Sequence, residues 1–296
     1  MTFIDLKFLG LPRVIGSAVL EGPAGLVLID PGPTSCLPAL ESGLADHGHR
    51  LKDVRTLLLT HIHLDHAGAT GTLMDRFPEL TAYVHARGAP HMIDPAKLLA
   101  SATRLYGLRM NELWGEFKPV PADRLHILNG GERLEVAGRS IDVAYTPGHA
   151  SHHVSYFDLT NGDAFVGDTV GIRVAGNYIK APTPPPDIDL EAWERSLQVI
   201  EAWRPRSLVL THFGIVDDVA EHLRKFRMAL ERSAALVRRS LDSDGNDEER
   251  IRRFSEDMRA EVRQVLSEAD ARSTEAAAPF DQLWQGLARY WRKRAA

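Results

Sequence analysis

Residues 60–68 read Thr-His-Ile-His-Leu-Asp-His-Ala-Gly, which places three imidazoles and one carboxylate within six consecutive positions. If the backbone stays extended through His61 and His63, their side chains point to the same side, because successive side chains of a strand alternate. A helix start in the following residues then brings Asp65 and His66 beside them. A lone histidine is usually a hydrogen-bonded structural residue, but so dense a cluster has little structural purpose without a cation. The stretch therefore predicts a metal-binding loop.

Three later apolar runs also end on a histidine or an aspartate: Val143 to His149, Phe165 to Asp168, and Val209 to His212. Such runs predict strands, and strand ends in one sheet layer lie close together, where loops can carry ligands on a rigid scaffold. With the cluster at 61–66 they supply seven candidate ligands. This number is too large for one tetrahedral ion and suits two ions about 3.5 to 4 Å apart with a carboxylate between them. We expect two divalent ions, zinc in the first place, with iron or manganese as alternatives because His/Asp sites accept all three.

The first 216 residues consist of short apolar runs bounded by Gly, Pro and Asp, a pattern typical of strands alternating with helices. Strands are expected at 26–30, 54–60, 83–85, 141–145, 154–157, 164–166 and 208–210. Residues 95–116 fit a helical stripe that includes Tyr106 and Trp114 and is best explained by packing on the core. The proline-rich segment 181–186 is expected to form an extended loop.

The chain changes character near residue 217. The last 80 residues hold 16 basic and 16 acidic side chains, and their apolar residues recur at helical spacing. We predict amphipathic helices that are interrupted at 243–246 and resume after Pro279. Balanced charges of this kind are typical of solvated helix faces. The sequence thus predicts a site-bearing domain over 1–216 and a helical C-terminal region over 217–296, through which a homodimer could form.

Composition excludes several classes of protein. The 296 residues carry a formal charge of −5 and include 13 histidines but one cysteine. A single cysteine excludes an intrachain disulfide scaffold and any structural zinc site with two or more thiolates. The negative balance provides no basic surface for phosphate backbones, so nucleic acid is not expected as a partner. The chain shows no signal-peptide pattern and no apolar run of about 18 residues. We expect a soluble cytoplasmic protein, without membrane association, that acts on a small-molecule substrate.

The motifs of this chain resemble those of the metallo-β-lactamase superfamily, particularly its glyoxalase II-like hydrolases. The resemblance rests on residues 60–68, 146–149, 167–169 and 211–214, which read THIHLDHAG, TPGH, GDT and THFG in the order of the family. It covers roughly residues 10 to 215. It implies an α/β (α+β) fold, a four-layer αββα sandwich, here with an appended α-helical C-terminal region. Residues 1–216 would then be the catalytic domain.

The resemblance also implies a division of the ligands. One ion is held by His61, His63 and His149, the other by Asp65, His66 and His212, and Asp168 bridges the two. Asp30, which follows an early apolar run, is expected to orient a ligand without binding an ion itself. Tyr178 and Lys180 are candidates for substrate binding, because glyoxalase II enzymes place Lys and Tyr between the bridging aspartate and the last histidine.

The chemistry that this site implies is hydrolysis. A hydroxide bridging the two ions attacks the carbonyl of an ester, thioester or lactone, while the ions polarise the carbonyl oxygen and stabilise the leaving group. Asp65 is the candidate catalytic residue, because it can orient the hydroxide and shuttle its proton. Three alternatives stay open: a mononuclear-iron persulfide dioxygenase, a phosphodiester hydrolase, and a non-catalytic metal-binding interaction protein.

Overall fold

Strand β3, Gly25–Ile29, shows how one sheet separates two cores. Leu26 and Leu28 belong to the apolar cluster beneath the N-terminal helices, whereas Val27 and Ile29 belong to the cluster between two sheets. Because side chains alternate along a strand, a run that is apolar at every position is buried on both faces. The computed structural model describes residues 1–295 and contains two sheets stacked in this way.

Each sheet has six strands. The first has the order β1-β2-β3-β4-β5-β6, and its strands are Thr2–Asp5, Gly16–Gly22, Gly25–Ile29, Val54–Leu58, Thr81–His85 and Leu125–Leu128. The second has the order β12-β11-β10-β9-β8-β7, and from β7 to β12 its strands are Arg133–Val136, Arg139–Tyr145, Val154–Asp158, Asp163–Phe165, Ser207–Leu210 and Gly214–Val216. Strands β3 to β6 run parallel, as do β10 and β11. Parallel strands bring the loops at their carboxyl ends to one edge of the sheet.

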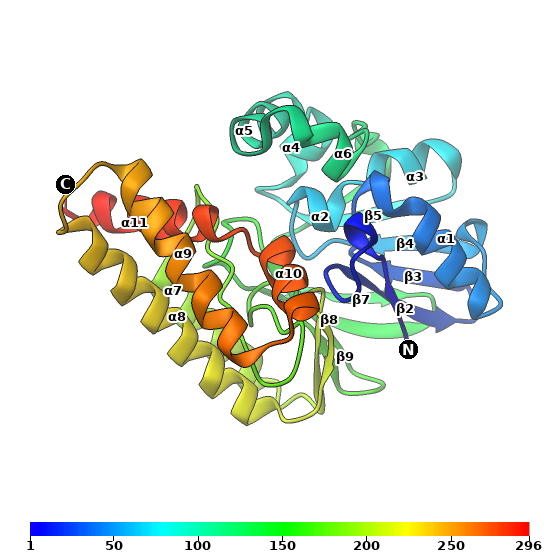
Figure 1. Cartoon of the computed structure of the whole chain (residues 1–296). Coiled ribbons are helices and arrows are strands. Elements are labelled where there is room, and N and C mark those ends of the chain that lie inside the picture. The colour runs from blue at the N-terminus through cyan, green and yellow to red at the C-terminus, as the bar shows by residue number, and fades with distance from the viewer. Residues whose placement is uncertain (296) are drawn as a thin grey trace.

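Helices cover the outer face of each sheet, which gives four layers (Figure 1). Those on the first sheet are α1 Leu37–Asp46, α2 Leu64–Ala67, α3 Thr70–Arg76, α4 Ala89–Ile93, α5 Ala96–Tyr106 and α6 Met110–Trp114. Those on the side of the second sheet are α7 Leu190–Ala202, α8 Val219–Leu241, α9 Asp247–Val265, α10 Glu268–Ala277 and α11 Phe280–Ala295. Short 3-10 turns lie at Phe8–Gly10, Thr34–Cys36, Leu51–Asp53, Gly107–Arg109 and Ala122–Arg124. The predicted αββα sandwich with appended helices is confirmed.

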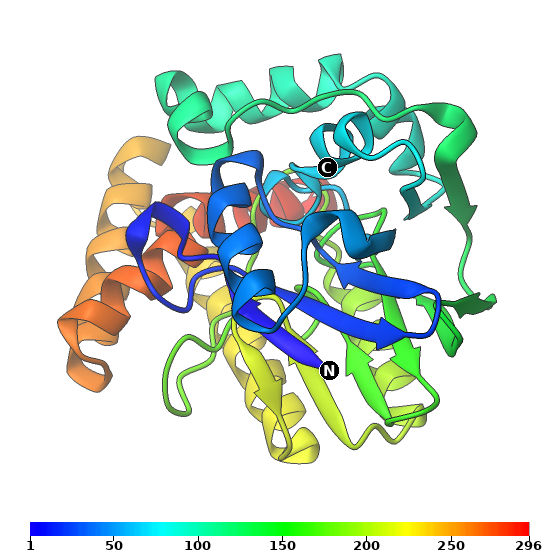
Figure 2. The ribbon, with the colours of Figure 1, turned by 90° about the vertical axis from the view of Figure 1, so that its right-hand side faces the viewer.

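The C-terminal helices share one apolar cluster with the second sheet. Trp193 of α7, Phe226 of α8 and Trp284 of α11 are buried in it together with Leu208 of β11. Helix α11 packs against α8 and α9, and Figure 2 shows the same helices behind the sheets after a quarter turn. The division at residue 216 stays a prediction: β12 ends there, yet the apolar cluster continues across it.

The predicted elements differ from the observed ones in two respects. Every predicted strand occurs, with ends shifted by at most two residues, but β1, β2, β6, β7 and β12 were not predicted. The expected helix over 95–116 is broken after Tyr106, because Gly107 has a φ of +54° and turns the chain before α6 begins. The interruption at 243–246 and the helix after Pro279 are confirmed. Within residues 1–295, none of the helices combines the length and apolar character needed to cross a membrane.

Candidate metal centre

Four loops that follow strands bring the seven candidate ligands together. After β4 the chain passes through His61 and His63 into the short helix α2, which carries Asp65 and His66. The other three ligands follow other strands: His149 after β8, Asp168 after β10 and His212 after β11. All are buried except His63 and Asp65, which are half-buried. The strand ends therefore meet in space, as the sequence predicts.

Three imidazole nitrogens meet in the first group. His61 Nε2 lies 2.9 Å from His63 Nδ1, and His149 Nε2 lies 3.0 Å from the same atom. A proton on His63 Nδ1 can be donated to only one of the two facing nitrogens, whereas a cation between the rings is bound by all three. The three nitrogens therefore form a group that could hold a cation.

The second group contains Asp65, His66 and His212. His212 Nε2 lies 3.3 Å from His66 Nε2 and 3.4 Å from Asp65 Oδ2. Asp168 lies between the two groups: its Oδ1 is 3.3 Å from His66 Nε2, and its Oδ2 is 3.3 Å from His149 Nε2. Each group therefore faces one oxygen of the same carboxylate.

The outward-facing ring nitrogens are fixed by carbonyl oxygens. His149 Nδ1 donates to the carbonyl of Pro182 at 2.9 Å, and His212 Nδ1 donates to the carbonyl of Val14 at 2.5 Å. Because a carbonyl oxygen can only accept, Nδ1 carries the proton in both rings and Nε2 keeps a free lone pair toward the site. These hydrogen bonds select the tautomer that a metal ligand requires.

Asp30 has the same effect on two further ligands. Its Oδ2 accepts hydrogen bonds from His66 Nδ1 and Thr60 Oγ1, both at 2.7 Å, and Thr60 Oγ1 in turn lies 3.1 Å from His61 Nδ1. The backbone N–H of Thr60 and the hydroxyl of Thr211 also donate to this carboxylate, at 2.8 and 3.0 Å. Asp30 is fully buried and has a left-handed φ of +53°, which a residue other than glycine rarely adopts. The structure places Asp30 behind His66 and Thr60, and its orienting role toward a bound ion stays a prediction.

The pKa values of the histidines shift in opposite directions in the two ligand groups: they fall in the first group and rise in the second. Burial lowers the pKa of His61 and His149, and burial together with the neighbouring His149 lowers that of His63 to about 4, so these rings are neutral. Burial alone would also lower the pKa of His66, but the carboxylates of Asp65 and Asp168 raise it well above its usual range. In the absence of a cation, the carboxylates therefore attract protons to the second group, and a metal ion has to displace them.

The donor set fits divalent cations. Asp168 Oδ1 is buried and, although His66 Nε2 lies 3.3 Å away, it forms no well-directed hydrogen bond among residues 1–295. A buried carboxylate oxygen of this kind is costly unless a positive charge faces it. Neutral imidazole nitrogens and carboxylate oxygens are ligands that zinc, iron and manganese share. His61, His63 and His149 would hold one ion, and Asp65, His66 and His212 would hold the other.

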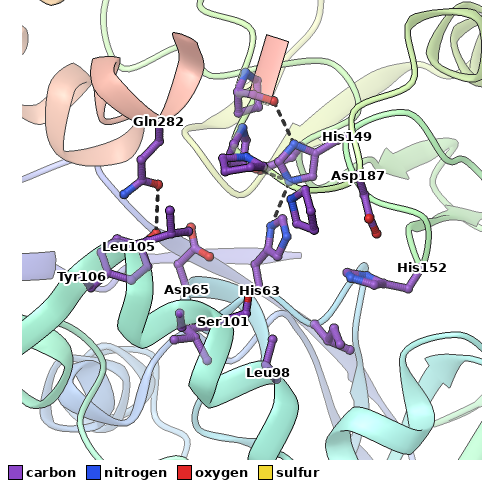
Figure 3. A pocket seen from close by; sticks show the side chains of 18 of the residues that line it. His63, Asp65, Leu98, Ser101, Leu105, Tyr106, His149, His152, Asp187 and Gln282 are labelled. Carbon is purple, nitrogen blue, oxygen red and sulfur yellow. Dashed lines mark hydrogen bonds and ion pairs between the residues drawn. The ribbon is translucent and has the colours of Figure 1, made fainter. Parts of the chain in front are cut away.

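A cavity of about 310 Å³ opens beside this centre, and Figure 3 shows the side chains around it. Asp65 and His63 face it from the metal centre. Leu98 and Leu105 of α5 form an apolar wall, and residues 277–283 of the C-terminal region form another part of the lining. The cavity therefore combines the metal centre with two helical segments that lie far apart in the sequence.

Tyr178 and Lys180, the two candidates for substrate binding, do not line this cavity. Residues 172–180 fold back on themselves, with Ile172 bridged to Lys180, and they pack against α9. Tyr178 Oη donates to Glu261 Oε1 at 3.2 Å, and Lys180 is buried with its Nζ 2.7 Å from Met258 Sδ. This placement argues against the substrate-binding role expected for both.

Residues not expected at the site line the cavity instead. Tyr106, which the helical pattern assigned to core packing, lies at the end of α5 and faces the cavity together with Gln282 of α11 (Figure 3). His152, which follows the loop of His149, is a further lining residue. The position of Tyr106 near the end of an amphipathic helix was a weak indication that it could reach the cavity. The position of Gln282 beside Tyr106 could not be predicted, because it depends on the packing of α11 against α5.

An αββα sandwich with histidines and aspartates gathered at its strand ends defines a class of metal-binding proteins, and comparison with known sequences identifies the family. A family model described as the metallo-beta-lactamase superfamily matches residues 12–212. The chain belongs to this superfamily. ST1585 of Sulfurisphaera tokodaii, described as a metallo-beta-lactamase fold-containing protein, is 28% identical over 219 residues, or 72% of this chain and 79% of that protein.

A further relative has a named activity, and two solved structures are similar to this chain. A hydroxyacylglutathione hydrolase of Synechococcus sp. is 29% identical over 169 residues, or 56% of this chain and 53% of its own, so the match spans about half of that enzyme. The crystal structure of ST1585 superposes with a TM-score of 0.68 at 20% identity and covers 97% of both chains. TTHA1623, solved in a di-iron-bound form, superposes with a TM-score of 0.53 at 26% identity and covers 71% of this chain and 92% of its own.

Proposed function

We propose that the chain is a dinuclear metallohydrolase that cleaves an ester, thioester or lactone of a small molecule, with zinc as its ion. The observation that carries this proposal is Asp168, whose two oxygens face two separate groups of ligands beside a cavity. Two divalent ions bound there would lower the pKa of a bound water toward about 7 and polarise a carbonyl oxygen. The hydroxyacylglutathione hydrolases among the relatives support a carbonyl substrate.

Asp65 contributes to this chemistry by orientation. Burial by itself would raise its pKa, but His66 and His212 lower it to about 2, so Asp65 is ionised at neutral pH. An ionised carboxylate at the cavity accepts a hydrogen bond from the attacking water and directs its lone pair toward the substrate carbonyl. Because its pKa is so low, Asp65 would release any proton that it takes up from the attacking water, and it would be ionised again before the next turnover.

The cavity sets the scale of the substrate. Its volume of about 310 Å³ lies at the lower end of the range of about 300 to 1,000 Å³ that is typical of small-molecule sites. The side chains of Leu98 and Leu105 offer apolar contact to the substrate, while His63 and Asp65 lie at the reacting end. A small acyl compound would fit this cavity, with its alkyl part against the two leucines and its carbonyl near His63 and Asp65.

Metal analysis combined with activity assays tests the proposal. Asp168→Asn and His149→Ala should lose bound zinc and hydrolysis together, because each removes a donor from the centre. His222→Gln is the matched control: His222 is also buried, but its ring donates to the carbonyl of Val170 outside the ligand groups, so this variant should keep its zinc. A variant with demonstrably empty metal sites and full turnover would overturn the proposal.

The same experiment decides between the proposed hydrolase and its alternatives. The substrate panel contains esters, thioesters, lactones, phosphodiesters and a persulfide, and elemental analysis measures zinc, iron and manganese. About one iron per chain with persulfide-dependent oxygen uptake would identify a dioxygenase instead. Turnover of phosphodiesters alone would contradict a carbonyl substrate, and a metal-loaded chain inactive on the whole panel would contradict an enzyme.

A further inference from the structure

His152 lies at the cavity but belongs to neither group of candidate ligands. Figure 3 shows it across the cavity from Tyr106 and Gln282, with its ring pointing toward His63. The ring stands perpendicular to that of His63, with centroids 5.6 Å apart, and nearly parallel to that of His61, with centroids 6.1 Å apart. His152 is therefore an imidazole beside the first ligand group that is not assigned to an ion.

The loop that carries His152 is held by hydrogen bonds on both sides. Ser151 donates its hydroxyl and its backbone N–H to Asp187 Oδ2, at 2.6 and 3.4 Å. The carbonyl of Ser151 accepts a hydrogen bond from Tyr145 Oη at 2.9 Å. His152 itself is only 9% exposed. A side chain on so constrained a loop has a defined position relative to the candidate ligands.

The two ring nitrogens of His152 have different surroundings. Nδ1 is buried and has no hydrogen-bond partner in the part of the chain that the structure describes. Nε2 also bonds to no residue of that part, but it is not buried, and it is open to the cavity that His152 lines. The neighbouring His153 differs, because its Nδ1 lies 3.0 Å from Thr146 Oγ1 and its Nε2 accepts from the backbone N–H of Asp168 at 3.3 Å. The protein thus bonds both nitrogens of His153 and leaves the ring of His152 free.

The burial of Nδ1 determines where the proton of His152 lies. A buried N–H without an acceptor loses the hydrogen bonds that it makes in water, and such orphaned donors are rarer in proteins than unpaired acceptors. A doubly protonated ring would also bury an N–H of this kind. The ring therefore carries one proton, on Nε2, and presents an N–H donor to the cavity. A neutral imidazole is a far weaker acid than an imidazolium, so this N–H donates a hydrogen bond without giving up its proton.

Resting on the proposed hydrolase function, we propose that His152 is a catalytic residue whose Nε2–H stabilises the oxyanion formed when the substrate carbonyl is attacked. As the attacking oxygen bonds to the carbonyl carbon, the electron pair of the C=O π bond moves to the carbonyl oxygen. His152 Nε2–H then donates a hydrogen bond to this negatively charged oxygen. The ring keeps its proton and is unchanged when the π bond re-forms and the C–O or C–S bond to the leaving group breaks.

Nitrogen NMR of the imidazole rings tests the position of the proton without reference to activity. The chain is labelled with 15N-histidine and measured at neutral pH, both metal-free and loaded with zinc. The signals of His152 are identified by their absence from the spectrum of His152→Gln. They should show a single proton, on Nε2, in both forms. A proton on Nδ1, or on both nitrogens, would overturn the inference.

Two variants test the donor in catalysis. His152→Leu removes the N–H and keeps an apolar side chain, whereas His152→Gln keeps an amide N–H near the position of Nε2. The substrate is the ester, thioester or lactone that the substrate panel identifies, prepared with leaving groups of different basicity. His152→Leu should lower kcat about 100-fold, the lower end of the effect of one oxyanion donor, and by the same factor for every leaving group.

The second variant and a control separate the donor from packing. His152→Gln should recover about 10-fold of the loss in His152→Leu, because it restores an N–H donor. His222→Gln is the matched control, since His222 bonds to the carbonyl of Val170 and does not line the cavity, and its kcat should be unchanged. All three variants should bind as much zinc as the unmodified chain, because His152 belongs to neither ligand group.

Three kinetic results would overturn the inference. The first is full activity of His152→Leu, and the second is an equal loss in both His152 variants, which would indicate packing. The third is a loss that grows with the basicity of the leaving group, which would indicate proton transfer to that group.

The outcome for His152 can be distinguished from the outcome for the proposed function. If the unmodified chain hydrolyses no ester, thioester or lactone, the proposed function fails, and calorimetry with an alkylphosphonate then tests His152 alone. The charged oxygens of this compound resemble the oxyanion, so the zinc-loaded chain should bind it about 10-fold more tightly than zinc-loaded His152→Leu does. Equal binding by the two, or binding by neither, would refute the role of His152.

Discussion

Replacing Asp30 by asparagine should weaken the metal centre without removing any of its ligands. Asp30 accepts hydrogen bonds at 2.7 to 3.0 Å from Thr60, His66 and Thr211. Whichever way an asparagine amide turns, its NH2 group faces one of these donors, and the remaining bonds lose the negative charge. A hydrogen bond to a charged group contributes about 1.5 to 3 kcal/mol, which corresponds to about 10- to 150-fold in affinity for the ion beside His66.

Competition with a chromogenic chelator measures this loss. Zinc affinity of Asp30→Asn should fall most at the position of His66, which bonds to Asp30 directly, and less at the position of His61, which Asp30 reaches through Thr60. Urea unfolding of the metal-free protein reports the accompanying loss of stability. Asp163→Asn is the matched control. Asp163 is also buried and accepts hydrogen bonds from Arg206 and Ser207, but it lies at the opposite end of β10 from Asp168. It should lose stability and keep its zinc affinity.

The reasoning would be refuted by an Asp30→Asn variant that binds two zinc ions as tightly as the unmodified chain. It would equally be refuted if Asp163→Asn weakened zinc binding to the same extent, because the effect would then reflect general destabilisation rather than orientation of His66.

Other perturbations test the packing and the electrostatics. Burial lowers the pKa of Lys180 to about 8, below the unfolded value of about 10.4, so the unfolded chain binds more protons between these pH values and stability should rise with pH across that window. Lys180→Met should be more stable at pH 7 and should lose this rise, as urea unfolding at a series of pH values will show. In Gly286→Ala the new Cβ would lie 2.0 Å from the carbonyl oxygen of Thr183, so α11 must shift at a cost of about 1 to 3 kcal/mol despite the better helix propensity of alanine; a higher urea midpoint would contradict this. Trp193→Ala removes a fully buried ring that also donates to the carbonyl of Thr169, and should cost about 3 to 5 kcal/mol in denaturant unfolding. Removal of zinc by a chelator should lower stability by about 2.7 kcal/mol for each ion that binds the folded chain, relative to protein held at 100 times the dissociation constant, which calorimetry at fixed free zinc can check.

The fold and the arrangement of the ligands were predictable because their signals are local. The buried strands are continuous apolar runs, and the ligands follow those runs within a few residues, as His61 follows β4 and His212 follows β11. Strands such as β6 and β7 escaped prediction because they are short and partly exposed, so neither alternation nor a continuous apolar run marks them. Burial alone did not decide which strands could be predicted: β2 is buried but begins with Gly16 and Ser17, so no long apolar run marks it.

The cavity was not predictable, because its wall depends on contacts between distant segments. Tyr106 and Gln282 are separated by 176 positions, and no pattern in either helix indicates the other. Tyr178 and Lys180 lie close to the ligands in the sequence but not in the cavity lining, because the chain turns back between Ile172 and Lys180 and packs both side chains against α9. Location along the chain predicted which candidate donors come together, but it did not predict which side chains line the cavity.

Residues 277–283, which line the cavity, affect the order in which the site assembles during translation and the way in which its specificity can change in evolution. The seven ligand positions all precede α8, whereas residues 277–283 follow it and leave the ribosome later than the ligands do. The donors can thus assemble while one side of the site is still open to ions, and the wall is added afterwards. Recombination that exchanges only residues 277–283 would present the same donors to a differently shaped substrate, so new specificities are accessible without changing the candidate ligands.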